Sequence, residues 1–263
     1  MTSIPGEHTR VTNSAYSSDM VNLADAPVID FDDRPAPAVL LSDVRGSDLR
    51  PFTLMRSAVQ KKITENDLSL LGVTSAMPDA GKSTISIALA ASLQKVLQRP
   101  VVLIDLDFKR ASVAEYLGVE VGTGVSDYLA NPQIDLQSVL IRIGNDDLFI
   151  APTRTINADT ATLLAGPRFR AMTQALRSNP QNPLCLFDLP PAFANDDAMI
   201  ALQNLDGYFV VVDSGKTTKQ HLLDLLKLLS PATCYGSILN RYQGMIGDSY
   251  GYGSAAYSRY YEE

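Results

Sequence analysis

Residues 68–84 read LSLLGVTSAMPDAGKST, an apolar run followed by a short loop and a Gly-Lys-Ser-Thr segment. The aliphatic run predicts a buried strand over Leu68–Thr74, and the residues that follow the loop predict a helix over Lys82–Leu97. A Gly-Lys-Ser/Thr segment between a strand and a helix is the context in which a loop binds a polyphosphate. The stretch therefore predicts a P-loop that holds Mg-ATP over Ala76–Thr84.

The first turn of that helix supplies the physical means of binding phosphate. Its backbone N–H groups have no partner within the helix, and the helix dipole adds partial positive charge beside them. Gly81 lets the backbone approach the phosphates, Ala80 belongs to the same loop, and Lys82 supplies a cation for the β- and γ-phosphates. Ser83 is predicted to bind Mg²⁺, and Thr84 is placed for the α-phosphate. ATP and Mg²⁺ are therefore the expected cofactors.

Further along the chain, strand-length apolar runs alternate with helical patterns. An amphipathic helix is expected to lead in from about Arg50, ahead of the P-loop. The later expected elements are strands at Val101–Asp105, Leu148–Ala151, Leu184–Asp188, Tyr208–Val212 and Ser237–Leu239, and helices at Phe169–Arg177 and Lys216–Leu229. Aliphatic strands that alternate with helices indicate a parallel sheet buried on both faces. We therefore predict an α/β P-loop NTPase fold with a mostly parallel, doubly wound sheet.

Acidic residues end two of the expected strands. The segment VVLIDLD closes on Asp105 and Asp107, and the segment LCLFDLPP contains Asp188. Side chains at the carboxyl ends of parallel strands face the ligand crevice, so these acids are expected beside the phosphates. Asp107 and Asp188 are predicted to hold the metal through water. Asp105 is predicted either to coordinate the metal through water or to accept a proton from a nucleophile, and together with Lys82 the three acids are the predicted catalytic residues.

Other polar residues near these strand ends allow more than one interpretation. Lys109 and Arg110 follow Asp107 closely, and either side chain is placed to neutralise phosphate. Asn240 follows the last expected strand. Contact with adenine and a simple turn are both open interpretations of this asparagine.

The charge distribution separates the two ends of the chain from its centre. The net charge is −7, and residues 1–48 carry eight acidic against three basic residues. That segment shows no sustained periodicity and is predicted to be a mostly disordered acidic tail, ahead of a P-loop domain over 49–241 and a tyrosine-rich tail over 242–263. Both tails are expected to be flexible. The acidic balance argues against a nucleic-acid partner, because phosphate neutralisation needs a surplus of Lys and Arg.

The cysteines and the apolar runs bear on the compartment. The two cysteines form no CxxC motif, which fits a reducing cytosol. No apolar run approaches the ~20 residues that span a bilayer. Any membrane connection is therefore expected to come through a partner.

Together these motifs resemble those of the bacterial tyrosine kinases, cytoplasmic autokinases that regulate polysaccharide export. TSAMPDAGKST is similar to the family's Walker A element, VLIDLDFKR to its second acidic motif, and LFDLPP to its Walker B element. The stretch DGYFVVVDSGKTTKQ and the tyrosine-rich end also look like the family. The resemblance runs from about Arg50 to the C-terminus and makes 49–241 a kinase domain. Asp79 stands where the family usually has glycine, Lys109 where it usually has arginine, and the family's ExxRxxR oligomerisation motif is poorly kept around Arg56.

The resemblance implies an ATP- and Mg²⁺-dependent protein-tyrosine autokinase that acts in trans within a homo-oligomer and regulates exopolysaccharide polymerisation and export. The implied phosphoacceptors are Tyr250, Tyr252, Tyr257, Tyr260 and Tyr261. A separate membrane adaptor of the polysaccharide co-polymerase type and a cognate tyrosine phosphatase are the implied partners. The chain is then expected to be cytoplasmic and to be recruited to the inner face of the membrane by its adaptor.

Two other functions remain open from the residues. A partition-type P-loop ATPase carries an extra lysine early in the loop, where this chain has Met77, and this difference counts against that function. A nucleotide-binding pseudokinase of the same export machinery would bind ATP without transferring phosphate. Asp79 and the incomplete oligomerisation motif favour the pseudokinase, and ATP binding without phosphate on the tail would identify it.

Overall fold

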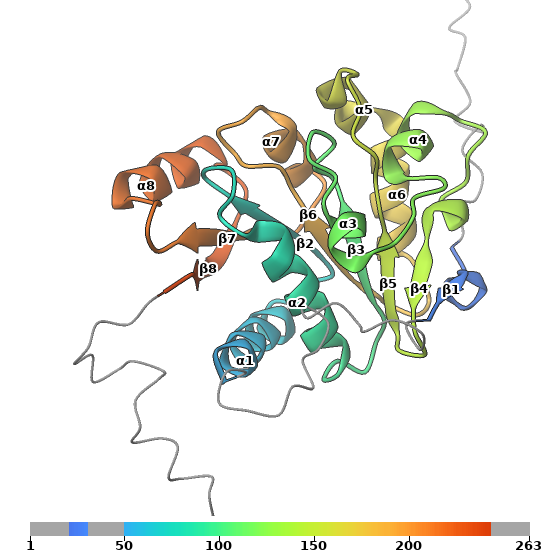
Figure 1. Cartoon of the computed structure of the whole chain (residues 1–263), viewed down its shortest axis with the longest axis horizontal. Coiled ribbons are helices and arrows are strands. Elements are labelled where there is room, and N and C mark those ends of the chain that lie inside the picture. Colours follow the sequence, from blue (N-terminus) through green and yellow to red (C-terminus); the bar gives the residue numbers. More distant parts are fainter. Residues whose placement is uncertain (1–20, 31–49, 243–263) are drawn as a thin grey trace, which may run out of the picture.

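The computed structural model describes residues 21–30 and 50–242, in which eight strands form one sheet in the order β1-β4-β5-β3-β6-β2-β7-β8 (Figure 1). The strands are β1 (Val28–Ile29), β2 (Leu70–Ser75), β3 (Val101–Asp105), β4 (Ile141–Ile143), β5 (Leu148–Ala151), β6 (Leu184–Asp188), β7 (Gly207–Asp213) and β8 (Cys234–Asn240). Neighbouring strands are parallel, except that β4 and β5 are antiparallel. The predicted α/β fold with a mostly parallel sheet is confirmed.

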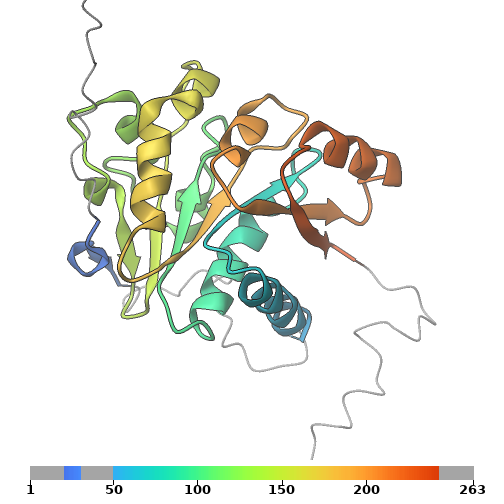
Figure 2. The same ribbon diagram turned by 180° about the vertical axis from the view of Figure 1, so that it is seen from behind.

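Helices cover both faces of this sheet, as Figures 1 and 2 show from opposite sides. They are α1 (Arg50–Glu65), α2 (Lys82–Gln94), α3 (Val113–Leu117), α4 (Val125–Ala130), α5 (Thr160–Ala165), α6 (Pro167–Arg177), α7 (Asp197–Leu202) and α8 (Lys219–Leu228), with a short 3₁₀ helix, η3, at Gln137–Val139. Residues of α1, α2 and α3 form the core on one face, and residues of α4, α6, α7 and α8 form the core on the other. None of the helices in the described part of the chain combines the length and apolar character that crossing a bilayer requires.

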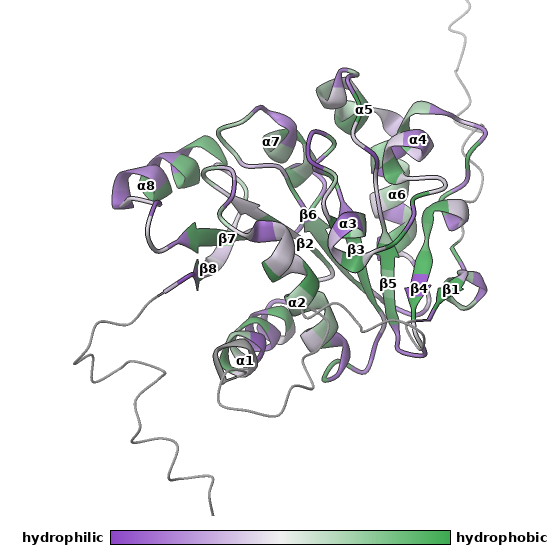
Figure 3. Cartoon of the chain, viewed as in Figure 1, coloured by the Kyte–Doolittle hydropathy of each residue, from purple (hydrophilic) through white to green (hydrophobic). Residues whose placement is uncertain are grey.

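The central strands are buried on both faces. In β3, Val101 and Leu103 pack toward α1, α2 and α3, whereas Val102 and Ile104 pack toward the opposite helices. Figure 3 accordingly colours the middle of the sheet as hydrophobic. Strands of this kind appear in the sequence as continuous aliphatic runs, which is why their positions were predictable.

Helix boundaries depend on capping residues as well as on periodicity. α8 begins at Lys219 rather than at the predicted Lys216, because Thr218 caps it. The Thr218 hydroxyl accepts a hydrogen bond from the backbone N–H of His221 at 3.1 Å. α2 ends at Gln94, three residues before the predicted end.

Residues 21–30 differ from the disordered tail predicted over 1–48. Leu23 begins a one-turn 3₁₀ helix, η1 (Leu23–Asp25), and its side chain is fully buried. β1 follows and pairs with β4 at the edge of the sheet. The Asn179 side chain donates a hydrogen bond to the backbone carbonyl of Val21 at 2.8 Å. The prediction is wrong for this segment, because one buried leucine and a two-residue strand leave no periodic pattern; the rest of 1–48 lies outside the described residues.

Leu23→Ala should lower the free energy of unfolding by about 2–5 kcal/mol, the usual range when a fully buried leucine leaves a cavity. The matched control is Val28→Ala in β1, because the Val28 side chain is 55 % exposed, and its expected change stays within about 0.5 kcal/mol. Urea unfolding of the full chain measures both values. Equal midpoints for the Leu23 variant and the wild type would show that the segment does not pack against the domain in solution.

Candidate active site

The carboxyl ends of three neighbouring strands form the centre of the candidate site. Asp105 at the end of β3 lies opposite Asp188 at the end of β6 in the strand register. β6 pairs on its other side with β2, which leads into the P-loop. The structure thus brings the three predicted acids together, and Asp105, Asp107 and Asp188 are all buried. Burying several carboxylates at one point is unfavourable unless a cation accompanies them.

The P-loop connects β2 to α2 through a glycine that no other residue could replace without strain. Gly81 caps α2 with a φ of +84°, in the left-handed region. A β-carbon at this position would lie 2.2 Å from Asn240 Nδ2. The Asn240 side chain donates a hydrogen bond to the Ala80 carbonyl at 2.8 Å and accepts one from the backbone N–H of Arg241 at 2.9 Å. Asn240 therefore stabilises the conformation of the P-loop. Its contact with adenine stays a prediction.

Lys82 is the cation that accompanies the buried acids. Its Nζ lies 2.8 Å from Asp107 Oδ2 and 3.6 Å from Asp188 Oδ2, and its side chain is only 9 % exposed. Burial by itself would lower the pKa of Lys82, but the carboxylates of Asp188 and Asp107 outweigh it and raise the pKa above its usual value. Lys82 is therefore held in its charged form beside the helix N-terminus where phosphate is expected.

Ser86 orients the Asp188 carboxylate from the second turn of α2. The Ser86 hydroxyl donates a hydrogen bond to Asp188 Oδ1 at 3.0 Å. Burial raises the pKa of Asp188, although Lys82 and the hydroxyls of Ser83 and Ser86 act in the opposite direction. Ser86 is not among the site residues predicted from the sequence. Its position four residues after Lys82, on the same face of a helix, is the signal that could have found it.

Asp105 shapes the loop that follows β3. Its Oδ1 accepts the backbone N–H of Asp107 at 3.0 Å, and its Oδ2 accepts that of Val113 at 3.2 Å. Burial and the neighbouring Asp188 carboxylate raise the pKa of Asp105 well above its usual value. A carboxylate with a raised pKa is a stronger base once it is ionised. Asp105 thus positions Asp107, and its role as the catalytic base stays a prediction.

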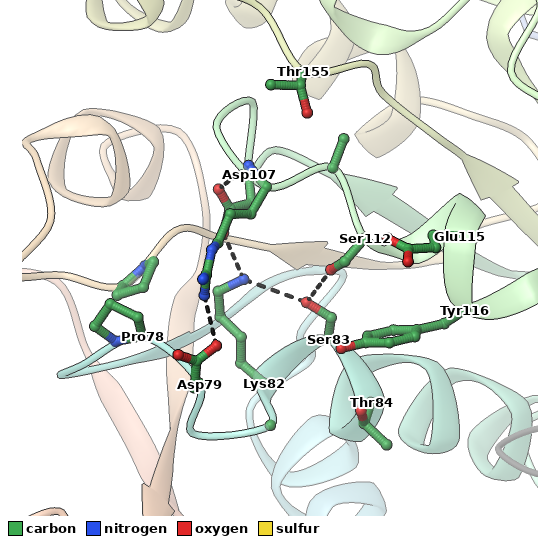
Figure 4. A pocket seen from close by; sticks show the side chains of 14 residues that line it. Pro78, Asp79, Lys82, Ser83, Thr84, Asp107, Ser112, Glu115, Tyr116 and Thr155 are labelled. Carbon is green, nitrogen blue, oxygen red and sulfur yellow. Dashed lines mark hydrogen bonds and ion pairs between the residues drawn. The ribbon is translucent and has the colours of Figure 1, made fainter.

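A cavity of about 360 Å³ opens in front of the P-loop. Gly81, Lys82, Ser83, Thr84 and Asp107 lie on its wall, and Figure 4 shows Lys82 and Ser83 close to Asp107, which comes from the loop after β3. Asp105 and Asp188 lie beneath this wall rather than on it. The cavity therefore combines the predicted phosphate-binding residues in one place.

Ser112 is a second site residue that was not predicted from the sequence. It lines the cavity at the start of α3, and its hydroxyl donates a hydrogen bond to the Ser83 hydroxyl at 2.9 Å. The predicted metal ligand is thus paired with a second hydroxyl. No spacing in the sequence relates Ser112 to Ser83, because the loop after β3 has an irregular path.

The structure distinguishes the two basic residues that follow Asp107. The Lys109 ammonium turns away from the cavity and donates hydrogen bonds to the carbonyls of Ile156 and Ala158 at 3.3 and 3.4 Å. Arg110 lines the cavity and forms an ion pair with Asp79 at 2.6 Å. Arg110 is therefore the one of the two that is placed to meet phosphate.

The donor set fits Mg²⁺, which binds oxygen ligands and keeps several waters. The Ser83 hydroxyl and the Asp107 carboxylate face the cavity. Asp188 Oδ2 is buried and has no hydrogen-bond donor among the described residues, although Lys82 is its neighbouring cation. In the described part of the chain, no three His, Cys, Asp or Glu residues are arranged to hold a metal ion by themselves. Magnesium would therefore rely on Ser83, on water and on the nucleotide as well as on these carboxylates.

The five predicted phosphoacceptors, Tyr250, Tyr252, Tyr257, Tyr260 and Tyr261, lie outside the described residues. Tyr242 is the last residue that the structure describes, and it is 47 % exposed. Tyr116 is 50 % exposed and lies on the wall of the cavity (Figure 4). Two other tyrosines, Tyr128 and Tyr208, are fully buried in the core. The domain itself thus presents few tyrosines to a kinase.

The sequence of this chain is similar to those of named tyrosine-protein kinases. The chain is 25 % identical over 218 residues to the tyrosine-protein kinase etk of Escherichia coli K12, which covers 82 % of this chain and 30 % of that protein. It is 24 % identical over 218 residues to the tyrosine-protein kinase YwqD of Bacillus subtilis, which covers 81 % of this chain and 90 % of that protein. The resemblance to the bacterial tyrosine kinases is confirmed.

The fold agrees with these relatives. The kinase domain of the Escherichia coli tyrosine kinase ETK superposes with a TM-score of 0.71 at 24 % identity, over 84 % of this chain and 85 % of that domain. No protein-family model matches the chain. The chain spans about 30 % of the length of the Escherichia coli relatives that it matches.

Proposed function

We propose that this chain is an ATP- and Mg²⁺-dependent protein-tyrosine autokinase that phosphorylates its own C-terminal tyrosine cluster in trans. The observation that carries the proposal is the Lys82 ammonium, which is held against Asp107 and Asp188 on the wall of a P-loop cavity. The relatives with which the chain shares this domain are named tyrosine-protein kinases. Asp105, Asp107, Asp188 and Lys82 are the proposed catalytic residues.

The reaction would move the γ-phosphoryl group from ATP to a tyrosine hydroxyl. The hydroxyl oxygen forms a bond to the γ-phosphorus, the bond from that phosphorus to the β–γ bridging oxygen breaks, and ADP leaves. Catalysis of this transfer is mostly positioning and charge stabilisation. A bound Mg²⁺ would neutralise phosphate oxygens, and Lys82 adds a second positive charge at the same place.

The remaining roles fall to groups on the cavity wall and directly beneath it. The backbone N–H groups of residues 80–84 would bind the phosphates at the start of α2. A tyrosine hydroxyl has a pKa of about 10, so it needs a base near neutral pH. Asp105 is the proposed base, since burial and the nearby Asp188 raise its pKa. Ser83, Asp107 and Asp188 are the proposed metal site, the two carboxylates acting through water.

The setting of the reaction follows from the resemblance to the family. We propose that the chain is cytoplasmic, that it regulates exopolysaccharide polymerisation and export, and that a separate membrane adaptor recruits it to the inner face of the membrane. A cognate tyrosine phosphatase would reverse the modification, and transfer in trans requires a homo-oligomer. The acidic net charge of −7 supports the absence of a nucleic-acid partner.

Mass spectrometry of dephosphorylated full-length protein incubated with Mg-ATP tests the proposed function. We expect phosphate on tyrosines between Tyr250 and Tyr261. Phosphate elsewhere, or none, would count against the autokinase. Saturable ATP binding without any phosphate would identify the pseudokinase, and ATP hydrolysis with ATP-dependent dimerisation but no phosphotyrosine would identify the partition-type ATPase.

A further inference from the structure

Three cationic side chains in the described part of the chain contact or belong to the P-loop, and they are held in different ways. Lys82 is buried against Asp107. Arg241 Nη1 binds the Asp79 backbone carbonyl at 2.7 Å and Asp213 Oδ2 at 2.8 Å. Arg110 instead forms its ion pair with the Asp79 carboxylate, and both side chains of that pair are more than half exposed. The partner of Arg110 thus belongs to the same loop that would hold phosphate.

Asp79 occupies an unusual backbone conformation. Its φ is +60°, in the left-handed region that residues with a β-carbon rarely adopt. The hydrogen bond from the Arg241 guanidinium to the Asp79 carbonyl fixes the backbone of this part of the loop. In Figure 4 the Asp79 side chain stands beside Lys82 at the edge of the cavity, and a dashed line marks its ion pair. A negative charge is therefore placed where negative phosphates are expected.

The Asp79–Arg110 pair can be broken at little cost. Exposed ion pairs contribute little to stability, because water screens the charges and both side chains lose freedom. A phosphate carries more negative charge than a carboxylate and offers the same forked geometry to a guanidinium. A polyphosphate in the cavity would therefore compete successfully for Arg110, which already lines that cavity.

We propose that Arg110 is a second phosphate-binding cation of this site and that Asp79 is its placeholder in the absence of nucleotide. The inference rests on the proposed binding of ATP. Asp79 then opposes nucleotide binding in two ways. Its own negative charge repels the phosphates, and its ion pair with Arg110 must break before Arg110 can bind them. Only the second effect depends on Arg110, so the two effects can be separated.

A double-mutant cycle on the full chain tests this proposal, with the dissociation constants of Mg-ATP and AMP measured by calorimetry. Asp79→Asn removes the charge and keeps a residue that tolerates positive φ. It should tighten Mg-ATP binding about three- to tenfold. Arg110→Met should weaken Mg-ATP binding about tenfold, the effect of losing a charged hydrogen bond. In the Arg110→Met background only the direct repulsion remains, so Asp79→Asn should tighten Mg-ATP binding by a smaller factor than it does in the wild type.

AMP and Arg110→Lys are the matched controls. AMP carries only the α-phosphate. Its dissociation constant should therefore change less than about twofold in Asp79→Asn, in Arg110→Met and in the double variant. Arg110→Lys keeps the charge and should lose less affinity for Mg-ATP than Arg110→Met does.

The outcomes separate this inference from the proposed function. An equal effect of Asp79→Asn in both backgrounds would show simple repulsion and overturn the placeholder role. Unchanged ATP affinity of Arg110→Met would overturn the role of Arg110. Failure of the wild-type chain to bind Mg-ATP would overturn the proposed function and the inference with it.

Discussion

Replacing Lys82 by methionine is expected to slow phosphate transfer at least about a hundredfold. Methionine keeps an unbranched apolar stem in the same space, so the substitution removes the ammonium with little change in packing. The lost charge lies between the P-loop cavity and the carboxylates of Asp107 and Asp188. Loss of one such stabilising group from a preorganised site lowers a rate by about 10²- to 10³-fold or more. Single-turnover incorporation of phosphate into dephosphorylated protein measures the effect.

The same substitution is expected to destabilise the fold. Without Lys82, the buried carboxylates of Asp107 and Asp188 lose the ammonium that lies beside them. Breaking a buried ion pair by removing one partner costs about 3–5 kcal/mol, so a loss in this range is expected near neutral pH. Urea unfolding measures it. Lys227→Met, an exposed lysine on α8, is the matched control and should stay within about 0.5 kcal/mol of the wild type.

The pH dependence of this loss has a definite sign. The pKa of Lys82 is raised in the folded protein, so its contribution is fully present below the unfolded value of about 10.4 and is lost as the pH rises through the folded value. The pKa values of Asp105 and Asp188 are also raised, so these acids take up protons in the folded protein before the unfolded chain does as the pH falls. The difference in the free energy of unfolding between the wild type and Lys82→Met should therefore become smaller at both acidic and alkaline pH. A difference that stays constant from acidic to alkaline pH would show that the ammonium does not interact with these acids.

The sequence predicted the P-loop and the buried strands because both leave local patterns. The Gly-Lys-Ser-Thr segment follows an aliphatic run directly, and β3, β5 and β6 have the predicted bounds. The strand order could not be predicted in the same way. It determines that Asp105 lies opposite Asp188 and that β6 separates β3 from β2, and such pairings between distant segments leave no trace in spacing.

The site residues also divide into those that a local sequence motif predicts and those that only the three-dimensional structure places. Lys82, Ser83 and Thr84, which belong to one contiguous motif, lie together on the cavity wall. The choice between Lys109 and Arg110 depended on the direction of an irregular loop, and only the structure resolves it. Short elements such as α3 and β1 were also missed, because two to five residues are too few to show a period.

Replacing the five tail tyrosines by phenylalanine is expected to remove most of the phosphate that the chain can incorporate. The chain has eleven tyrosines, and Tyr250, Tyr252, Tyr257, Tyr260 and Tyr261 lie together near its end. In the domain, Tyr128 and Tyr208 are fully buried, and burial raises the pKa of Tyr208 to about 12. Such groups cannot reach a kinase site without unfolding. Quantitative mass spectrometry of the variant after incubation with Mg-ATP measures the loss.

The matched control is Tyr116→Phe, because Tyr116 is the half-exposed tyrosine on the cavity wall. If the tail is the substrate, this single variant should keep its tail phosphate while the fivefold variant loses it. Full incorporation by the fivefold variant, with phosphate on Tyr116 or Tyr242, would contradict the assignment of the tail.

Phosphorylation of the tail should also change the assembly of the chain. Each phosphate adds about −1.5 to −2 charges at neutral pH, and the chain already carries −7. A tail that enters the cavity of a neighbouring copy meets Asp79 and Asp107 at the cavity wall. While a nucleotide occupies the cavity, its own phosphates add to these negative charges, so a tail with several phosphates would be repelled from that cavity. We therefore expect light scattering to show a smaller mass for the phosphorylated chain than for the dephosphorylated chain. The fivefold variant should show no such change, and an equal mass for both wild-type forms would exclude release by charge.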